Sequence, residues 1–129
     1  MNSLVCVTPG LFEYRRRDEP ALKPGHAIIK VRRVGICGTD LHAFEGTQPY
    51  FDYPRILGHE LSGELVEVYS PNSFAAGELV TIIPYYHCGH CIACRSGKTN
   101  CCVSMQVCGV HVDGAMVEYF QVPDYALVH

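Results

Sequence analysis

The chain has no run of about 18 apolar residues that could cross a membrane, and it has no long block of like charge. Its formal net charge of −3 is too mild for a nucleic-acid partner, and two acidic residues follow the arginines at 15–17 at once. The start also lacks the basic and apolar leader of a secretory signal. These absences predict a cytoplasmic protein with neither membrane nor nucleic acid as its partner.

Long helical periodicity is also missing, and short apolar segments separated by proline or glycine take its place. Short strands with frequent breakers are typical of an all-β barrel or sandwich with long working loops. The 129 residues suit one domain. Only 38–44 and the residues after Cys91 have the pattern of short helices. We predict strands at 3–8, 11–15, 26–35, 61–69, 77–85 and 114–122.

Sulfur, by contrast, is abundant, because the chain has eight cysteines. Without export a disulfide framework is not expected, and a reducing compartment favours metal thiolates. One cluster has the spacing C-x2-C-x2-C-x7-C, which supplies the four ligands of a structural zinc ion. Such a closed shell orders a loop and leaves no position for a substrate. The predicted ligands are Cys88, Cys91, Cys94 and Cys102. Cys6 and Cys108 lie in apolar segments and are expected to be inert core thiols.

Other interpretations of the cluster stay open. An iron–sulfur cluster also uses C-x2-C-x2-C, but its usual continuation, C-x3-C-P, does not follow here. Cys101 adjoins Cys102 and could replace it, although we prefer Cys102. His87 and His90 could also bind a metal, but four cysteines complete the shell, so we expect both histidines to be exposed loop residues.

A second group of metal-binding side chains comes from the sequences GICGTDLH and LGHE. They offer one thiolate at Cys37, imidazoles at His42 and His59, and a carboxylate at Glu60. Three protein ligands would leave a fourth position for water or substrate, which is the pattern of a catalytic zinc ion.

In combination these motifs resemble the zinc-dependent medium-chain alcohol and polyol dehydrogenases. The matching motifs are GICGTDLH, then GHE followed by Gly63, then GELV, then the cysteine cluster, in that order. ICGTDLH and VHVDGAMVEY look closest to the sorbitol dehydrogenase-like branch and to the hexonate and threonine dehydrogenases. The resemblance implies a GroES-like fold: mainly β, a partly open barrel with short helices and a protruding zinc-binding lobe at about 85–105.

The resemblance also implies the ligands of the catalytic zinc ion. Cys37 corresponds to its thiolate ligand and His59 to its imidazole ligand. Glu60 corresponds to a carboxylate that binds the metal directly in the polyol branch. In other branches of the family this carboxylate does not bind the metal directly, or water replaces it as the ligand. Asp40 corresponds to the partner that orients the ligand histidine.

Two further matches concern the proton of the substrate. Thr39 corresponds to the hydroxyl that receives this proton, and His42 to the end of a relay that passes it to solvent. The alternative for His42 is an ordinary surface histidine, but an imidazole suits proton exchange near neutral pH. Tyr50, Phe51 and Tyr53 fall between the ligand segments, so they either line the mouth of the pocket or simply pack.

The reaction of the family is hydride transfer from the carbon of an alcohol to NAD(P)+, with zinc activating the alcohol oxygen. The branch implies a secondary alcohol of a polyol or sugar acid as the substrate, and a homo-oligomeric full-length enzyme. The dinucleotide fingerprint G-x-G-x-x-G is absent from these 129 residues. We therefore expect only the catalytic domain, which binds zinc but lacks turnover without an NAD(P)-binding domain.

The alternative function is a stand-alone β-barrel interaction module stabilised by zinc. An open site at Cys37, His59 and Glu60 argues against it, because such a module has no use for one. An iron–sulfur electron carrier is the second alternative, and its brown colour separates it from a zinc protein. One residue departs from the family pattern: Tyr69 stands where glycine or alanine usually permits a tight bend, which leaves the geometry of that bend open.

Overall fold

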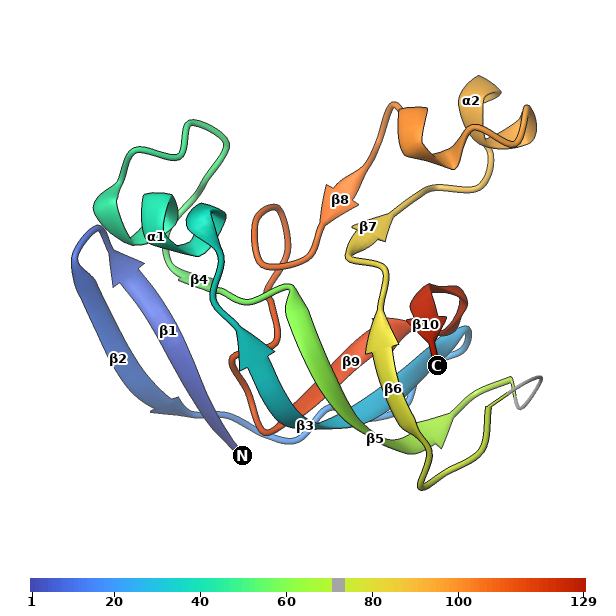
Figure 1. The fold of residues 1–129 in the computed structure, drawn as a ribbon, viewed down its shortest axis with the longest axis horizontal. Helices are drawn as coiled ribbons and strands as arrows, with labels where there is room; N and C mark the ends of the chain where they lie inside the picture. The colour runs from blue at the N-terminus through green and yellow to red at the C-terminus, as the bar shows by residue number, and fades with distance from the viewer. Residues whose placement is uncertain (71–73) are drawn as a thin grey trace.

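The computed structural model describes residues 1–70 and 74–129, and strands dominate it (Figure 1). This confirms the predicted mainly-β class, and no helix of the described residues is long and apolar enough to cross a membrane. The strands are β1 (Asn2–Thr8), β2 (Leu11–Arg16), β3 (His26–Gly35), β4 (Arg55–Ile56), β5 (Glu60–Val68), β6 (Leu79–Ile82), β7 (Tyr85–Tyr86), β8 (Gln106–Val107), β9 (Tyr119–Pro123) and β10 (Leu127–Val128). The helical elements are α1 (Gly38–Glu45), α2 (Ile92–Arg95) and the 3-10 helices η1 (Thr99–Cys101) and η2 (Asp124–Ala126).

The smaller of the two main sheets has the strand order β2-β1-β4. Its hairpin turns at Gly10, whose φ of 78° lies in the left-handed region that glycine enters without steric cost. Strand β1 buries Val5 and Cys6, whereas β2 is mostly exposed. Ser3 bridges to Val117, which links this sheet to the stretch before β9.

The larger sheet has the order β10-β6-β5-β3-β9, with β3 paired antiparallel to both β5 and β9. On β3 the pairing passes from Ile28, opposite Glu67, to Ile29, opposite Leu65. Val66 is therefore an extra residue, a β-bulge, and it is 36% exposed. The bulge explains why hydrophobic alternation is imperfect over 61–69.

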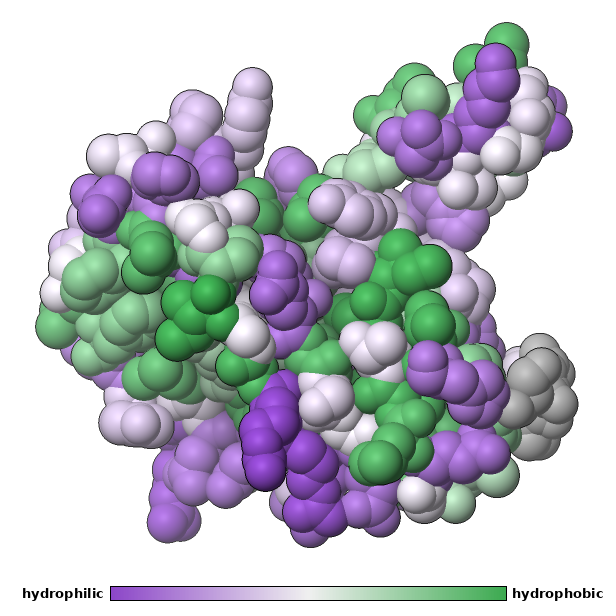
Figure 2. Space-filling view, in the orientation of Figure 1, coloured by the Kyte–Doolittle hydropathy of each residue, from purple (hydrophilic) through white to green (hydrophobic). Residues whose placement is uncertain are grey.

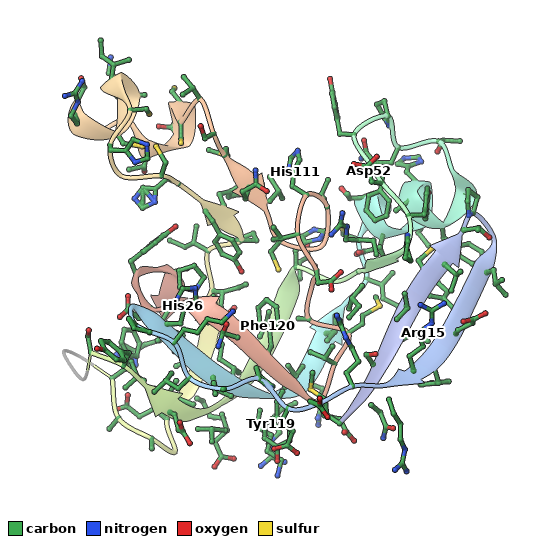
Figure 3. All side chains as sticks on the ribbon, turned by 180° about the vertical axis from the view of Figure 1, so that it is seen from behind. Arg15, His26, Asp52, His111, Tyr119 and Phe120 are labelled. Carbon is green, nitrogen blue, oxygen red and sulfur yellow. The ribbon has the colours of Figure 1, made fainter. Side chains whose placement is uncertain are left out.

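The main hydrophobic core lies on the inner face of the larger sheet and includes Ile29, Leu65, Val122 and Phe120. Figure 3 shows Phe120 pointing inward from β9 while its neighbour Tyr119 points away. Alternate side chains of a strand lie on opposite faces, so β9 contributes one row to this core.

A second, smaller core lies under α1 and joins Cys6, Ala43 and Leu57. Phe12 from β2 stacks on Phe44 from α1 with ring centroids 5.1 Å apart. Helix α1 is thus fixed against the smaller sheet by side-chain packing, and this holds the start of the helix in place.

The segment between β7 and β8 projects from the barrel as an arm, and Figure 2 shows it standing clear of the main body. We call residues 87–105 the cysteine lobe. Tyr125 anchors its base, because its hydroxyl accepts from His87 N at 3.0 Å and donates to His87 O at 3.2 Å. His90 is exposed as predicted, but His87 is half-buried with its ring edge-on to Tyr125, so the expectation for His87 was wrong.

Within 1–70 and 74–129 the sheets do not join into a closed cylinder, in agreement with a partly open barrel. The last predicted strand is shorter than expected and begins at Tyr119, because Gly114–Met116 make their backbone hydrogen bonds with 56–58 instead. Tyr69 itself is not in the left-handed region of the backbone: its side chain is exposed and its N–H donates to His26 O at 2.9 Å.

Candidate metal sites

Cys37 is the N-cap of α1, so the start of the helix sets the direction of its thiol. Its Sγ accepts from Thr39 N at 3.3 Å, and its own N–H donates to Asp40 Oδ2 at 3.0 Å. Cys37 and Asp40 also form a capping box, in which each side chain accepts from the backbone N–H of the other residue.

His59 comes from the opposite direction, between β4 and β5, and its Nε2 lies 3.1 Å from Cys37 Sγ. Ligand atoms of Cys37, Asp40 and His59 all lie within 4.8 Å of one another. At Zn–S and Zn–N bonds of about 2.3 and 2.0 Å, two tetrahedral ligands stand about 3.5 Å apart, so the observed pair suits one shared ion. His59 Nδ1 is buried and has no hydrogen-bond partner in the described structure.

Asp40 is buried, with 4% exposure, and ties the two ligand segments together. Oδ2 accepts from Cys37 N, while Oδ1 accepts from Gly58 N at 3.1 Å. Its distance to His59 Nδ1 is 3.8 Å, too long for a hydrogen bond. The resemblance implied that Asp40 orients the ligand histidine, and no motif indicated its contact with the backbone of Gly58.

Glu60 lies outside the group that joins Cys37, Asp40 and His59. Its side chain is directed toward β3, where a Cβ added to Gly35 would lie 2.8 Å from Oε2. An open cavity of about 530 Å³ borders His59 and Glu60 on this side. Glu60 is exposed.

Thr39 and His42 share one face of α1, since they are three residues apart. Thr39 is half-buried and His42 is exposed. His42 Nδ1 lies 3.2 Å from Thr47 Oγ1 and 3.6 Å from Glu45 Oε2. No hydrogen bond joins Thr39 to His42 in the part of the chain that the structure describes.

The aromatic residues between the ligand segments divide into two kinds. Tyr50 is 74% exposed, whereas Phe51 and Tyr53 pack against the core under α1. The Tyr53 hydroxyl donates to Ala43 O, which adds a tie to the helix. Packing therefore accounts for Phe51 and Tyr53, and Tyr50 alone is free to face a ligand.

The cysteine lobe brings four sulfur atoms within 4.8 Å of one another, from Cys88, Cys91, Cys94 and Cys102. Exposed Cys101 is not in this group. Backbone N–H groups point at the sulfurs: Cys91 N lies 3.4 Å from Cys88 Sγ, and Cys88 N lies 3.4 Å from Cys102 Sγ.

These contacts alter the acidity of the thiols. The backbone N–H of Cys94 lowers the pKa of Cys91, and the backbone N–H of Cys88 lowers the pKa of Cys102. Burial and the neighbouring Cys91 thiol raise the pKa of Cys94. Crowded sulfurs cannot all ionise without a cation between them, so this donor set fits a thiolate-binding metal.

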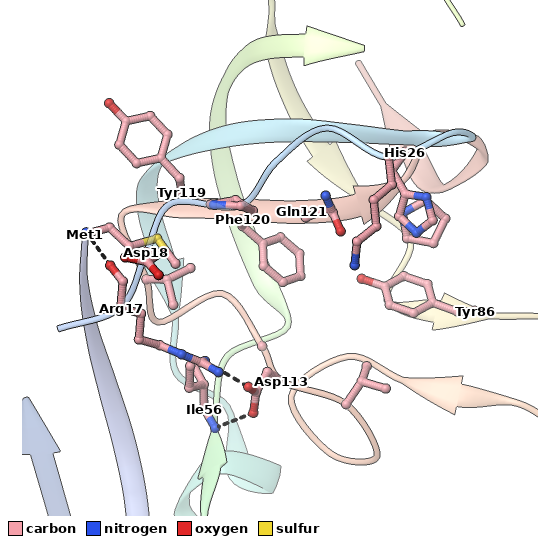
Figure 4. Close-up of a pocket in the computed structure, with 16 residues that line it drawn as sticks. Met1, Arg17, Asp18, His26, Ile56, Tyr86, Asp113, Tyr119, Phe120 and Gln121 are labelled. Carbon is pink, nitrogen blue, oxygen red and sulfur yellow. Dashed lines mark hydrogen bonds and ion pairs between the residues drawn. The ribbon is translucent and has the colours of Figure 1, made fainter. Parts of the chain in front are cut away.

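A further cavity of about 570 Å³ lies on another side of the barrel, beside β9 (Figure 4). Arg17, Ile56 and Asp113 border it and are joined by hydrogen bonds. Neither of the two groups of metal-type ligands found among the described residues lies there. The sequence pointed to no site at this place.

Comparisons with known proteins agree with this architecture. Residues 23–129 match the family described as Alcohol dehydrogenase GroES-like domain. L-galactonate-5-dehydrogenase of Escherichia coli K12 is 47% identical over 124 residues, covering 95% of this chain and 36% of that protein. Galactitol-1-phosphate dehydrogenase from Escherichia coli superposes with a TM-score of 0.89 at 28% identity, over 99% of this chain and 37% of that one.

Another solved relative, the alcohol dehydrogenase RspB from Escherichia coli CFT073, was crystallised with cofactor NADH. It superposes with a TM-score of 0.89 at 36% identity, over 99% of this chain and 37% of that chain. The fold is thus that of the GroES-like domain of the zinc-dependent alcohol dehydrogenases. The chain belongs to the alcohol dehydrogenase GroES-like domain family, and it spans about a third of the length of the relatives it matches.

Proposed function

We propose that this chain is the catalytic domain of a zinc-dependent, NAD(P)-linked dehydrogenase that oxidises a secondary alcohol of a polyol or sugar acid. The observation that carries the proposal is the pairing of Cys37 Sγ with His59 Nε2 at 3.1 Å, beside an open cavity. A soft thiolate paired with an imidazole that borders an open cavity supports a catalytic zinc site, which needs a free coordination position.

In this proposal Cys37 and His59 hold the ion, and Glu60 supplies a third ligand by rotating its exposed side chain. Asp40 keeps both ligand segments at a fixed separation through its two backbone hydrogen bonds. Zinc bound there would act as a Lewis acid toward the alcohol oxygen and, in the reverse direction, toward the carbonyl. The lobe cysteines Cys88, Cys91, Cys94 and Cys102 hold a second zinc ion that has only a structural task.

Residues of helix α1 accept the proton of the alcohol and transfer it to solvent. Thr39 stands two residues beyond Cys37 in the first turn of the helix, and its hydroxyl accepts the proton. His42 lies on the same face of the helix and is exposed, so its imidazole exchanges the proton with solvent. The two side chains need a bridging water or a substrate hydroxyl between them, because they make no direct hydrogen bond.

The substrate class is supported by the names of the relatives. One acts on a sugar acid, L-galactonate, and another on a polyol phosphate, galactitol 1-phosphate. Hydride transfer requires a cofactor, and RspB was solved with NADH. The dinucleotide would be held by a separate nucleotide-binding domain, so these 129 residues alone are expected to give no steady formation of NAD(P)H.

Cobalt-substituted protein tests the open coordination position. Imidazole should shift the visible spectrum of the wild type by occupying the free position beside Cys37 and His59, and it should leave Cys37→Ala unchanged. The sealed four-thiolate site gives no response in either protein. An imidazole-insensitive spectrum in fully loaded wild type would remove the support for an enzyme and favour the interaction module.

A further inference from the structure

The three residues before His59 are bound to a second segment, 113–116. Gly114 N donates to Ile56 O at 2.7 Å, Met116 N donates to Leu57 O at 3.1 Å, and Ala115 N donates to Gly58 O at 2.8 Å. We call this set of contacts the 56–58 clamp. It explains why 114–116 does not join β9, and it fixes the chain immediately ahead of the proposed ligand.

Gly58 is the residue on which the clamp converges. Its φ of 90° lies in the left-handed region, and its N–H donates to Asp40 Oδ1. Its carbonyl, which belongs to the peptide bond of His59, accepts from Ala115 N and lies 3.6 Å from the buried thiol of Cys108. The peptide groups on both sides of Gly58 are thus held by hydrogen bonds. The clamp therefore sets the direction of the His59 side chain.

Gly114 makes the close approach possible. A Cβ added at this position would clash with Gly58 O and would lie 2.5 Å from Leu57 O, so the backbone of these two residues would have to shift. Asp113 fixes the same turn from the other side: Oδ1 accepts from Ile56 N at 3.1 Å and Oδ2 accepts from Arg17 at 3.0 Å (Figure 4). The motif DG at 113–114 therefore holds this segment against residues 56–58, a role that the sequence did not suggest.

We propose that Gly114, held by Asp113, is a positioning residue for His59: the clamp it permits places Nε2 opposite Cys37 Sγ. This inference rests on the proposed function, since it concerns the same metal site. Gly114 has no side chain that could bind metal or substrate, so it acts through the backbone of Leu57 and Gly58. A side chain here displaces the Leu57–Gly58 backbone and turns the imidazole away from the thiolate.

Cobalt titration of the 129-residue chain tests this inference, because sulfur-to-cobalt charge-transfer bands separate a four-thiolate site from a Cys–His site. Gly114→Ala should weaken binding at the Cys37–His59 site at least tenfold and leave the lobe site unchanged. The matched control is Gly63→Ala, where the new Cβ would lie 2.6 Å from Lys30 O, inside the larger sheet and away from the site. It should lower thermal stability while both cobalt sites keep wild-type affinity and spectra.

A Gly114→Ala protein that binds two cobalt ions like wild type would overturn the inference, and so would an equal loss at this site in Gly63→Ala. Should Gly114→Ala not fold, Asp113→Ala and Asp113→Asn give the same answer. The alanine removes the acceptor of Ile56 N and should weaken the Cys37–His59 site several-fold, whereas the asparagine retains an acceptor and should restore it. Equal affinities in these two variants would also contradict the proposal. If wild type itself binds only the lobe cobalt, the proposed function fails instead.

Discussion

Cys37 Sγ and His59 Nε2 lie 3.1 Å apart, although 22 residues separate them in the chain. Their meeting is produced by the fold and not by local sequence. Helix α1 aims the thiol, the 56–58 clamp aims the imidazole, and the Asp40 carboxylate joins the backbones of both segments. Three separate sets of contacts therefore hold the two proposed ligands opposite each other.

Replacing Asp40 by alanine should destabilise the metal-free protein. The buried carboxylate accepts two backbone N–H groups, and losing hydrogen bonds to a charged group typically costs about 1.5–3 kcal/mol each. We expect a loss of about 3 kcal/mol in the free energy of unfolding, measured with urea in the presence of a chelator. Asp40→Asn keeps one acceptor and should lose clearly less. Equal stability of Asp40→Ala and wild type would contradict the assigned role.

Replacing each of two neighbouring cysteines by serine tests which of them is a zinc ligand of the lobe. Cys102→Ser should abolish zinc binding by the lobe, because Cys102 Sγ lies in the sulfur cluster and accepts from Cys88 N. Cys101→Ser should bind zinc like wild type, because Cys101 is exposed and outside the cluster. Zinc release on titration with a thiol-blocking mercurial measures both. The opposite result would assign Cys101 as the ligand.

The two core thiols should resist modification. Burial raises the pKa of Cys6 and raises that of Cys108 to about 11, so neither is a thiolate at pH 8. In the zinc-loaded protein, iodoacetamide should label Cys101 first, and Cys6 and Cys108 should react only after unfolding. Peptide mass mapping over time gives the order. Early labelling of Cys108 would show that the 56–58 clamp opens readily.

Glu118 should contribute to stability against acid. Its carboxylate accepts from the backbone N–H and side-chain amide of Asn2, which hold its pKa below the ordinary value of 4.5. A carboxyl group with a lowered pKa in the folded state stabilises the fold above its unfolded pKa, and this stabilisation is lost as pH falls through the folded pKa. Thermal melts of Glu118→Gln from pH 6 to pH 3 should therefore approach wild type as the pH decreases. A constant difference across this range would exclude the linkage.

Much of the fold was accessible from sequence, because its signals are local. Proline and glycine marked the hairpin of β1 and β2, and the β-branched run at 26–35 became β3 with the predicted bounds. The cysteine spacing predicted a compact sulfur cluster, since four ligands from one loop need only a local turn. The short helices after Cys37 and Cys91 were likewise confirmed.

The features missed by sequence reasoning are non-local. The 56–58 clamp depends on backbone hydrogen bonds between segments far apart in the chain, and neither segment has a hydrophobic pattern that would reveal the pairing. Residues 114–116 look like the start of a strand by composition, yet their N–H groups bond to the residues before His59 instead of extending β9. The bulge at Val66 and the contact of His87 with Tyr125 also depend on which elements meet in space.

We infer that this chain builds two unlike metal sites, one closed by four thiolates and one open at Cys37 and His59. Native mass spectrometry of protein saturated with zinc counts the ions that each variant binds. We predict two zinc ions bound to wild type, one to Cys37→Ser, one to Cys102→Ser and none to the double variant. Equal zinc content in wild type and Cys37→Ser would contradict the account, because the open site would then not exist.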